Sequence, residues 1–120
     1  MSAWGTEVRV VNATRNLVLA ERAELASGPW QRMVGLLGRD RLEEGEGLIL
    51  QSCNAIHTCF MRFAIDVIFL DKQGRVVRLF PEMVPFRFSP LVFRAHSAVE
   101  LPAGTIARSG TEVEDHLVLA

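Results

Sequence analysis

Cysteine, tyrosine and excess charge are scarce in this chain. It has two cysteines, no tyrosine and a formal net charge of −1. Two cysteines in 120 residues cannot make a disulfide scaffold. A chain this close to neutral has no overall field that would attract nucleic acid or an anionic membrane, so nucleic-acid binding is disfavoured.

Long apolar runs are missing as well. No segment reaches the roughly 18 uncharged apolar residues that span a bilayer, so we expect no membrane span. Residues 1–10 lack the charged start and the apolar run of a signal peptide. These two absences predict a cytoplasmic protein.

The common catalytic signatures are absent too. The sequence has no phosphate-binding glycine loop, no nucleophile elbow, no HExxH motif and no pair of cysteines at metal-ligand spacing. We therefore expect neither a cofactor nor a metal. Catalytic residues are unknown at this stage, and the sequence does not decide whether the protein is an enzyme.

What the chain does have is apolar content, at 49% of its residues. A chain of this length folds as one domain and buries roughly two-thirds of the surface that the unfolded chain exposes. We expect residues 1–120 to form a single domain that is a monomer or a weak oligomer.

The order of the apolar residues predicts mostly β-structure. Residues 7–11 and 17–25 flank a turn-rich segment and predict a hairpin. Residues 65–70 and 75–80 flank a tight turn that ends in glycine, and they predict a second hairpin. Further strands are predicted at residues 47–51, 56–61, 99–101, 105–107 and 113–119.

A short helix is predicted near residues 28–35. Ser27 can cap its free amides, and Pro29 fits the first turn, where no intrahelical donor is needed. Trp30, Met33 and Val34 then follow at helical spacing. The predicted fold is therefore mainly β (β-rich α+β), a compact single-domain barrel or closed sandwich of short strands with one short helix.

Several motifs resemble one known family. Residues 32–39 read RMVGLLGR, residues 57–71 read HTCFMRFAIDVIFLD, and residues 99–104 read VELPAG. With these motifs, residues 6–119 resemble the DUF192 (UPF0127) family. The resemblance implies a small β-rich domain and little about activity, because that family is uncharacterised and many of its members look exported.

The chain departs from the family pattern at three positions. Ala64 stands where the family usually has proline, which would stiffen the bend before Ile65. Gly38 replaces a large side chain at the end of the predicted helix. Glu114 stands where glycine is common, which leaves open whether the backbone there is left-handed.

Asp66 is the first candidate for a functional group. Its apolar neighbours place its carboxylate at the end of a buried strand. The favoured interpretation is structural: the carboxylate accepts backbone amides from a turn, or pairs with Arg62 or Arg32. The alternative is a buried acid with a shifted pKa in a cleft.

Cys53, His57 and Cys59 are a second candidate set. If this segment is extended, odd-numbered side chains share one face. Thiol and imidazole groups together can bind zinc or support nucleophilic chemistry. Their spacing matches no usual zinc signature, so free thiols and a hydrogen-bonded core histidine are the favoured interpretation.

Arginine and phenylalanine alternate loosely between residues 78 and 96. Proteins that stack bases over a basic groove use such residues. The low net charge favours instead a proline-broken flap, residues 81–96, whose phenylalanines cover a core while its arginines stay in water. Exposed phenylalanines in this flap would indicate a protein partner.

These patterns predict a small-molecule- or protein-binding accessory domain that is not an enzyme. Its ligand or partner is unknown and would lie near residues 53–71 and the flap. The alternative is an enzyme that uses Asp66 or Glu100 as acid or base, with His57 nearby. Convergence of Arg32, Asp66 and Glu100 in space would mark a pocket. The candidate binding residues are Trp30, Arg32, His57, Cys59, Arg62, Asp66 and Glu100.

Overall fold

The computed structural model describes residues 6–26, 36 and 39–120. Within this part of the chain, seven strands form one sheet in the order β5-β4-β6-β3-β2-β1-β7. All neighbouring strands are antiparallel except β2 and β3, which are parallel. The strands are β1 (Glu7–Asn12), β2 (Leu17–Ala26), β3 (Glu46–Gln51), β4 (Ile65–Leu70), β5 (Val76–Met83), β6 (Ser97–Pro102) and β7 (Leu117–Leu119).

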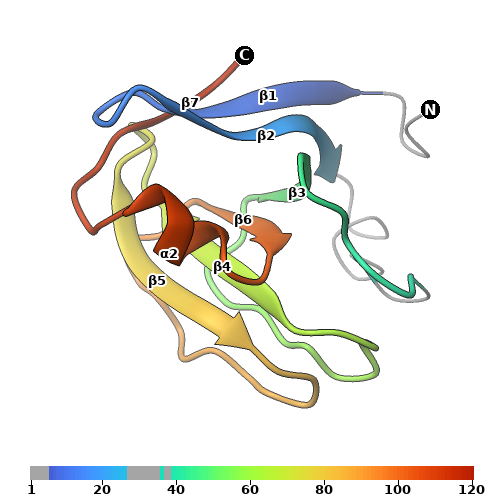
Figure 1. Cartoon of the computed structure of the whole chain (residues 1–120). Coiled ribbons are helices and arrows are strands. Elements are labelled where there is room, and N and C mark those ends of the chain that lie inside the picture. The colour runs from blue at the N-terminus through green and yellow to red at the C-terminus, as the bar shows by residue number, and fades with distance from the viewer. Residues whose placement is uncertain (1–5, 27–35, 37–38) are drawn as a thin grey trace.

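The sheet curls into a half-barrel around one short helix, α2 (Thr105–Ser109) (Figure 1). This helix contacts both β2 and β5, which lie four positions apart in the sheet order. A helix of five residues is only about 7.5 Å long. Both strands can reach it only because the sheet bends, so the face that carries α2 is the concave one.

The start of β5 is tied to the segment that leads into β7. Val76 donates its N–H to the Asp115 carbonyl, and Glu114 donates to the Val76 carbonyl, each at 2.8 Å. Glu114 has a φ of 81°, so the left-handed backbone is kept here without glycine. These bonds join the two edges of the sheet and narrow the open side of the half-barrel.

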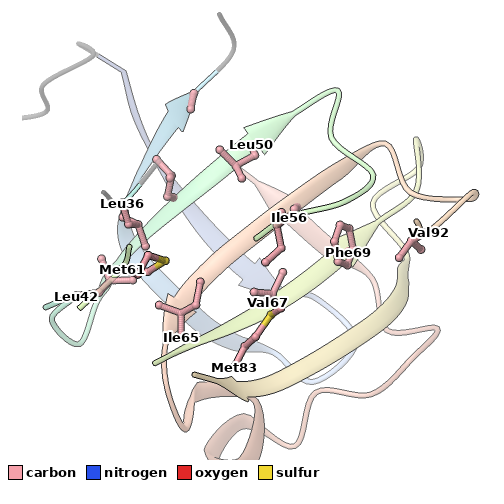
Figure 2. Packing of buried hydrophobic residues seen from close by; sticks show 13 residues of the cluster. Leu36, Leu42, Leu50, Ile56, Met61, Ile65, Val67, Phe69, Met83 and Val92 are labelled. Carbon is pink, nitrogen blue, oxygen red and sulfur yellow. The ribbon is translucent and has the colours of Figure 1, made fainter. Parts of the chain in front are cut away.

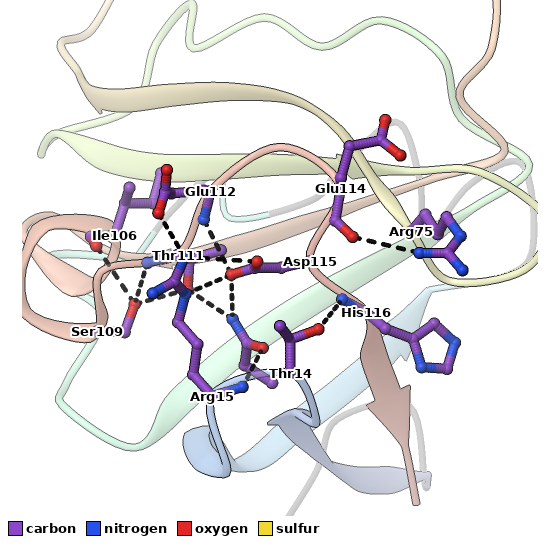
Figure 3. Close-up of polar contacts among 11 residues, drawn as sticks. Thr14, Arg15, Arg75, Ile106, Ser109, Thr111, Glu112, Glu114, Asp115 and His116 are labelled. Atoms are coloured by element: carbon purple, nitrogen blue, oxygen red, sulfur yellow. Dashed lines mark hydrogen bonds and ion pairs between the residues drawn. The ribbon is translucent and has the colours of Figure 1, made fainter.

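A buried polar cluster around Asp115 fixes this closure (Figure 3). Its carboxylate accepts hydrogen bonds from Asn12 Nδ2 at 3.0 Å and from Arg15 Nε at 2.6 Å. Burial by itself would raise the pKa of Asp115. The hydrogen bonds from Arg15, Asn12 and the Glu112 N–H outweigh it and bring that pKa below its usual value. The cluster therefore joins the β1–β2 turn to the chain before β7.

Each face of the sheet packs its own apolar core. On β4, Ile68 and Leu70 belong to the core on the concave face, together with Ile106 of α2. Val67 and Phe69 alternate with them and belong to the core on the convex face. Figure 2 shows what covers the convex face: the side chains of Leu36, Leu42, Ile56, Met61 and Val92.

The structure confirms the mainly β fold class and both predicted hairpins. β1 pairs with β2, and β4 pairs with β5 from Val67–Phe80 to Leu70–Val76. β5 continues past Pro81 to Met83, because an edge strand tolerates a residue without N–H. Predicted strands at residues 47–51 and 99–101 lie inside β3 and β6. The predicted helix at residues 28–35 lies outside the described residues.

Three predicted strands are wrong in whole or in part. Residues 105–107 belong to α2, because Gly104 (φ 97°) turns the chain and Asp66 holds the first amides of the helix. Residues 56–61 form only an isolated bridge between His57 and Phe88. Of residues 113–119, only Leu117–Leu119 are a strand, since Glu114 and Asp115 form a turn that bonds Val76 of β5.

Candidate functional site

Two loop segments lie side by side next to the convex core. Residues 54–58 pair with residues 86–92 through backbone hydrogen bonds of 2.8 to 3.1 Å. The bonds run from Val92 N–H to the Asn54 carbonyl, from Ser89 N–H to Ile56, and from Phe86 N–H to Thr58. We call residues 84–96 the flap, because β5 ends at Met83.

Thr58 is the polar anchor of the flap. It is fully buried. Its hydroxyl donates to the Val84 carbonyl at 2.7 Å and accepts the Arg87 N–H at 2.9 Å. Its backbone N–H donates to the Arg87 carbonyl at 2.9 Å. One side chain therefore fixes both the start of the flap and its first turn.

The outer side of this paired structure is aromatic and exposed. We call the exposed apolar side chains of these segments the flap patch: Phe60, Val84, Phe86, Phe88, Leu91 and Phe93. Phe60 and Phe93 are 76% and 85% exposed. The expectation that the flap phenylalanines cover a core is therefore wrong. The core beneath is filled instead by Ile56, Met61 and Val92.

Two rings of the patch are held in place by a costly backbone. Phe60 and Phe86 have φ angles of 65° and 63°, a region that bulky residues rarely adopt. Their rings meet edge to face with centroids 5.6 Å apart. Each such residue costs about 1–3 kcal/mol, and strain of this kind clusters at functional sites. The fold thus holds an exposed aromatic pair at an energetic cost.

His57 and Cys59 lie at the edge of the flap patch. His57 is exposed and its ring lies 6.0 Å from that of Phe88. Its Nδ1 accepts the Cys59 N–H at 3.2 Å. The segment is not a strand, so the argument that odd residues share one face does not hold. The Cys53 thiol donates to the Ala55 carbonyl at 3.1 Å, and the described residues contain no group of three metal-ligating side chains.

Asp66 lies on the concave face and is fully buried. Its carboxylate accepts three backbone N–H groups: Ile106 at 2.7 Å, Glu82 at 2.8 Å and Gly104 at 3.2 Å. The expected pairing with Arg62 is wrong, because Arg62 is exposed and bonds Asp40. The structural interpretation, a carboxylate that accepts turn amides, is confirmed.

Glu100 lies on the opposite face from Asp66. In the register of β4 and β6, Val67 faces Glu100 and Asp66 faces Leu101. Glu100 is only 3% exposed, and within the described residues its Oε1 has no hydrogen-bond partner. Burial raises the pKa of this carboxyl to about 8. Asp66 and Glu100 therefore do not meet in one pocket.

A second buried glutamate, Glu24, shares the face of Glu100. Leu48 of β3 pairs with both, so the backbones of the two glutamates lie two strand spacings apart, roughly 10 Å. Glu24 Oε2 has no hydrogen-bond partner in the described structure, while its Oε1 pairs with Arg39 at 3.5 Å. Sequence reasoning missed Glu24 and Thr58, because a single polar residue in an alternating or irregular segment gives no sign of burial.

Trp30 and Arg32, the two remaining candidates, lie outside the described residues. The expected pocket of Arg32, Asp66 and Glu100 is wrong, because Asp66 and Glu100 lie on opposite faces of the sheet. What the structure brings together is the flap patch with His57 and Cys59 at its edge.

A model of one protein family matches residues 10–119 of the chain. The family is DUF192, described as "Uncharacterized ACR". The chain belongs to the DUF192 family. A UPF0127 protein of Thermococcus sibiricus (strain DSM 12597 / MM 739) is 33% identical over 112 residues, which cover 90% of this chain and 72% of that protein.

Two solved structures share the DUF192 fold seen here. One is a proposed transcription regulator from Sinorhizobium meliloti 1021, with a TM-score of 0.82 and 23% identity over 99% of this chain and 97% of that one. The other is a protein of unknown function from Novosphingobium aromaticivorans DSM 12444, with a TM-score of 0.80 and 24% identity over 94% and 84%.

The structure gives the DUF192-like motifs a physical meaning. The Ile65-Asp66-Val67 motif supplies the buried carboxylate, and Gly104 at the end of the VELPAG motif donates one of its hydrogen bonds. This hydrogen bond joins Gly104, at the start of α2, to Asp66, which lies 38 positions earlier in the sequence. These motifs therefore specify how the start of α2 is attached to β4.

Proposed function

We propose that this chain is a protein-binding accessory domain that is not an enzyme, and that the flap patch is its binding surface. The observation that carries the proposal is the strained, exposed pair of Phe60 and Phe86. Contiguous exposed apolar patches on soluble proteins mark interaction sites. Aromatic side chains are enriched among the residues that dominate binding energy.

The charges around the patch select the kind of partner. Residues 52–63 and 84–96 contain Arg62, Arg87 and Arg94 and no Asp or Glu. Arg62 is paired with Asp40, so Arg87 and Arg94 supply the positive charge. The remainder of the chain has ten basic and fourteen acidic residues, so it is net negative. A partner segment with apolar side chains flanked by Asp or Glu fits this surface, because complementary charge speeds encounter and rejects basic partners.

Selection from a random peptide display library on the immobilised protein tests this proposal. We expect enriched peptides to combine apolar residues with Asp or Glu. Phe86→Ala and Phe93→Ala should each weaken binding of an enriched peptide by about tenfold, as for interface anchors. Val113→Ala removes an exposed apolar side chain outside the flap and should leave affinity unchanged.

Three outcomes would contradict the proposal. Enriched peptides could bind both phenylalanine variants as well as the unaltered protein. The selection could enrich basic peptides. A labelled single-stranded oligonucleotide could bind more tightly than any peptide, with the salt dependence of phosphate contacts.

A second candidate function is an enzyme that uses Glu100 as a general acid. Asp66 does not support it, since all the described bonds of its carboxylate go to backbone amides. Glu100 does, because a buried carboxyl with a pKa near 8 keeps its proton at neutral pH. A turnover of the purified protein that Glu100→Gln abolishes without unfolding would favour this candidate.

A further inference from the structure

A cavity opens at one end of the half-barrel, and none of its lining residues belongs to the flap patch. Its volume is about 390 Å³, within the usual range for sites that bind small molecules. Ile49, Leu70 and Leu117 of the concave core form its apolar part. Lys72, His96 and Ser97 supply polar groups at its rim. The mouth of a barrel is a common place for a ligand site.

The rim of this cavity is held rigidly. The β4–β5 turn is bound to β7 by the Leu117 N–H, which donates to the Gly74 carbonyl at 2.8 Å. His116 Nε2 bonds the Gln73 carbonyl at 2.7 Å. Gly74 has a φ of 85°, and a Cβ there would lie 2.6 Å from the Leu117 carbonyl oxygen. Only glycine permits this close approach, so the cavity is preformed.

Lys72 gives the rim a positive charge, and His96 adds an imidazole. Both are exposed, and neither side chain has a hydrogen bond or an ion pair within the described structure. The backbone of His96 is fixed by its N–H to the Leu70 carbonyl at 2.7 Å and by the Cys53 N–H to its carbonyl at 3.0 Å. Asp71 also lines the cavity, and its Oδ1 accepts the Gln73 and Arg75 amides within the turn.

From this geometry we infer that the mouth of the half-barrel binds a small organic carboxylate with an apolar body. The apolar part of the ligand lies against Ile49, Leu70 and Leu117, and its carboxylate meets Lys72 and His96. Charge-assisted hydrogen bonds to such a carboxylate are stronger than bonds to a neutral group. The site does not depend on the flap patch, so the two proposals succeed or fail separately.

Titration with matched pairs of probes tests the inference. The probes are phenylacetate and hexanoate, each compared with its neutral amide, phenylacetamide or hexanamide. In ¹H–¹⁵N spectra of the whole chain, the carboxylates should shift the amide signals of Lys72, Gly74, His96 and Leu117 saturably. The neutral amides should bind at least about fivefold more weakly, because they lose the charge-assisted bonds.

Variants locate the site. Lys72→Met and His96→Gln should each weaken carboxylate binding by about fivefold, while Arg41→Met, an exposed cation outside the cavity, should not. Lys72 is the only lysine in the sequence, so an amine-reactive reagent labels one side chain, and phenylacetate should slow that labelling. Non-saturable shifts, equal binding of amides and carboxylates, or full binding by Lys72→Met would overturn the inference.

Discussion

At the scale of single residues, Asp66 shows how one buried carboxylate can hold together elements that lie far apart in the sequence. A helix start leaves backbone N–H groups without intrahelical partners. Asp66 accepts two of them, from Gly104 and Ile106, and adds the Glu82 amide of β5. One side chain thus joins β4, β5 and α2.

Asp66→Ala should destabilise the protein by about 3 kcal/mol or more, because buried amides are left without acceptors. Urea unfolding followed by circular dichroism measures this loss. Asp40→Ala removes an exposed carboxylate paired only with Arg62 and should change stability by less than about 1 kcal/mol. Equal stability of Asp66→Ala and the unaltered protein would refute the structural role.

Glu100 is the opposite example, because burial of its carboxyl lowers the free energy of unfolding at neutral pH. Its pKa is raised from 4.5 to about 8 in the folded protein. Below pH 4.5 both states hold the proton on Glu100, so this carboxyl does not lower the stability there. Between pH 4.5 and 8 the unfolded chain ionises first, so stability falls with rising pH by up to about 1.4 kcal/mol per unit.

Glu100→Gln removes this titration and should flatten the pH profile. At pH 7 the variant should be more stable than the unaltered protein by about 3 kcal/mol, with the difference vanishing near pH 4. Urea unfolding from pH 4 to 9 measures both curves. Glu44→Gln, at an exposed position, is the control and should follow the unaltered protein. Parallel curves for Glu100→Gln would show that the carboxyl is ionised when buried.

At the scale of elements, the flap is an irregular segment ordered by a few fixed contacts. Val92 and Met83 are buried at its two ends, and Thr58 bonds its first turn. Between these anchors the side chains of Phe86 and Phe88 are free to face outward. The order of the patch therefore depends on Thr58 more than on the phenylalanines themselves.

Thr58→Val keeps the shape of the side chain and removes its hydroxyl. We expect a loss of about 1–2 kcal/mol, because the Val84 carbonyl and the Arg87 N–H lose a buried partner. Hydrogen exchange at residues 86–92 should become about tenfold faster, while exchange in β4 should change less. Thr6→Val, at an exposed position, is the control. Unchanged exchange in the flap would show that the hydroxyl does not order it.

At the scale of the whole molecule, the alternation of apolar residues was sufficient to predict both hairpins. Ile65–Leu70 carries apolar side chains on both parities, which predicts a strand buried on both faces. The alternation does not say which parity faces the concave side. That depends on the curl of the sheet, which α2 and the β5–β7 contacts impose.

The elements that were predicted wrongly depend on partners distant in the sequence. α2 has five residues, too few for a helical pattern, and its first amides are held by Asp66 about 40 residues earlier. Residues 56–61 have the composition of a strand, but they pair with the flap in only one bridge. Neither the VELPAG motif nor the sequence of residues 56–61 gives a local signal of these contacts.

The candidate site shows the same division. His57 and Cys59 lie beside the flap, although the extended strand that was expected to bring them to one face is absent from the described residues. The outward position of Phe60, Phe86 and Phe93 was not predicted, because an apolar side chain in a loop normally indicates burial. Only packing decides that Ile56, Met61 and Val92 fill the core and leave the phenylalanines outside.

The sequence by itself determined the family, the mainly β fold and the two hairpins, because these depend on local periodicity and on motifs that can be read along the chain. The tertiary structure alone decided which carboxyl is satisfied, which has an oxygen without a partner among the described residues, and which phenylalanines reach water. Those outcomes depend on contacts between residues far apart in the chain. Two apolar or acidic residues with similar neighbours in sequence therefore end in opposite environments.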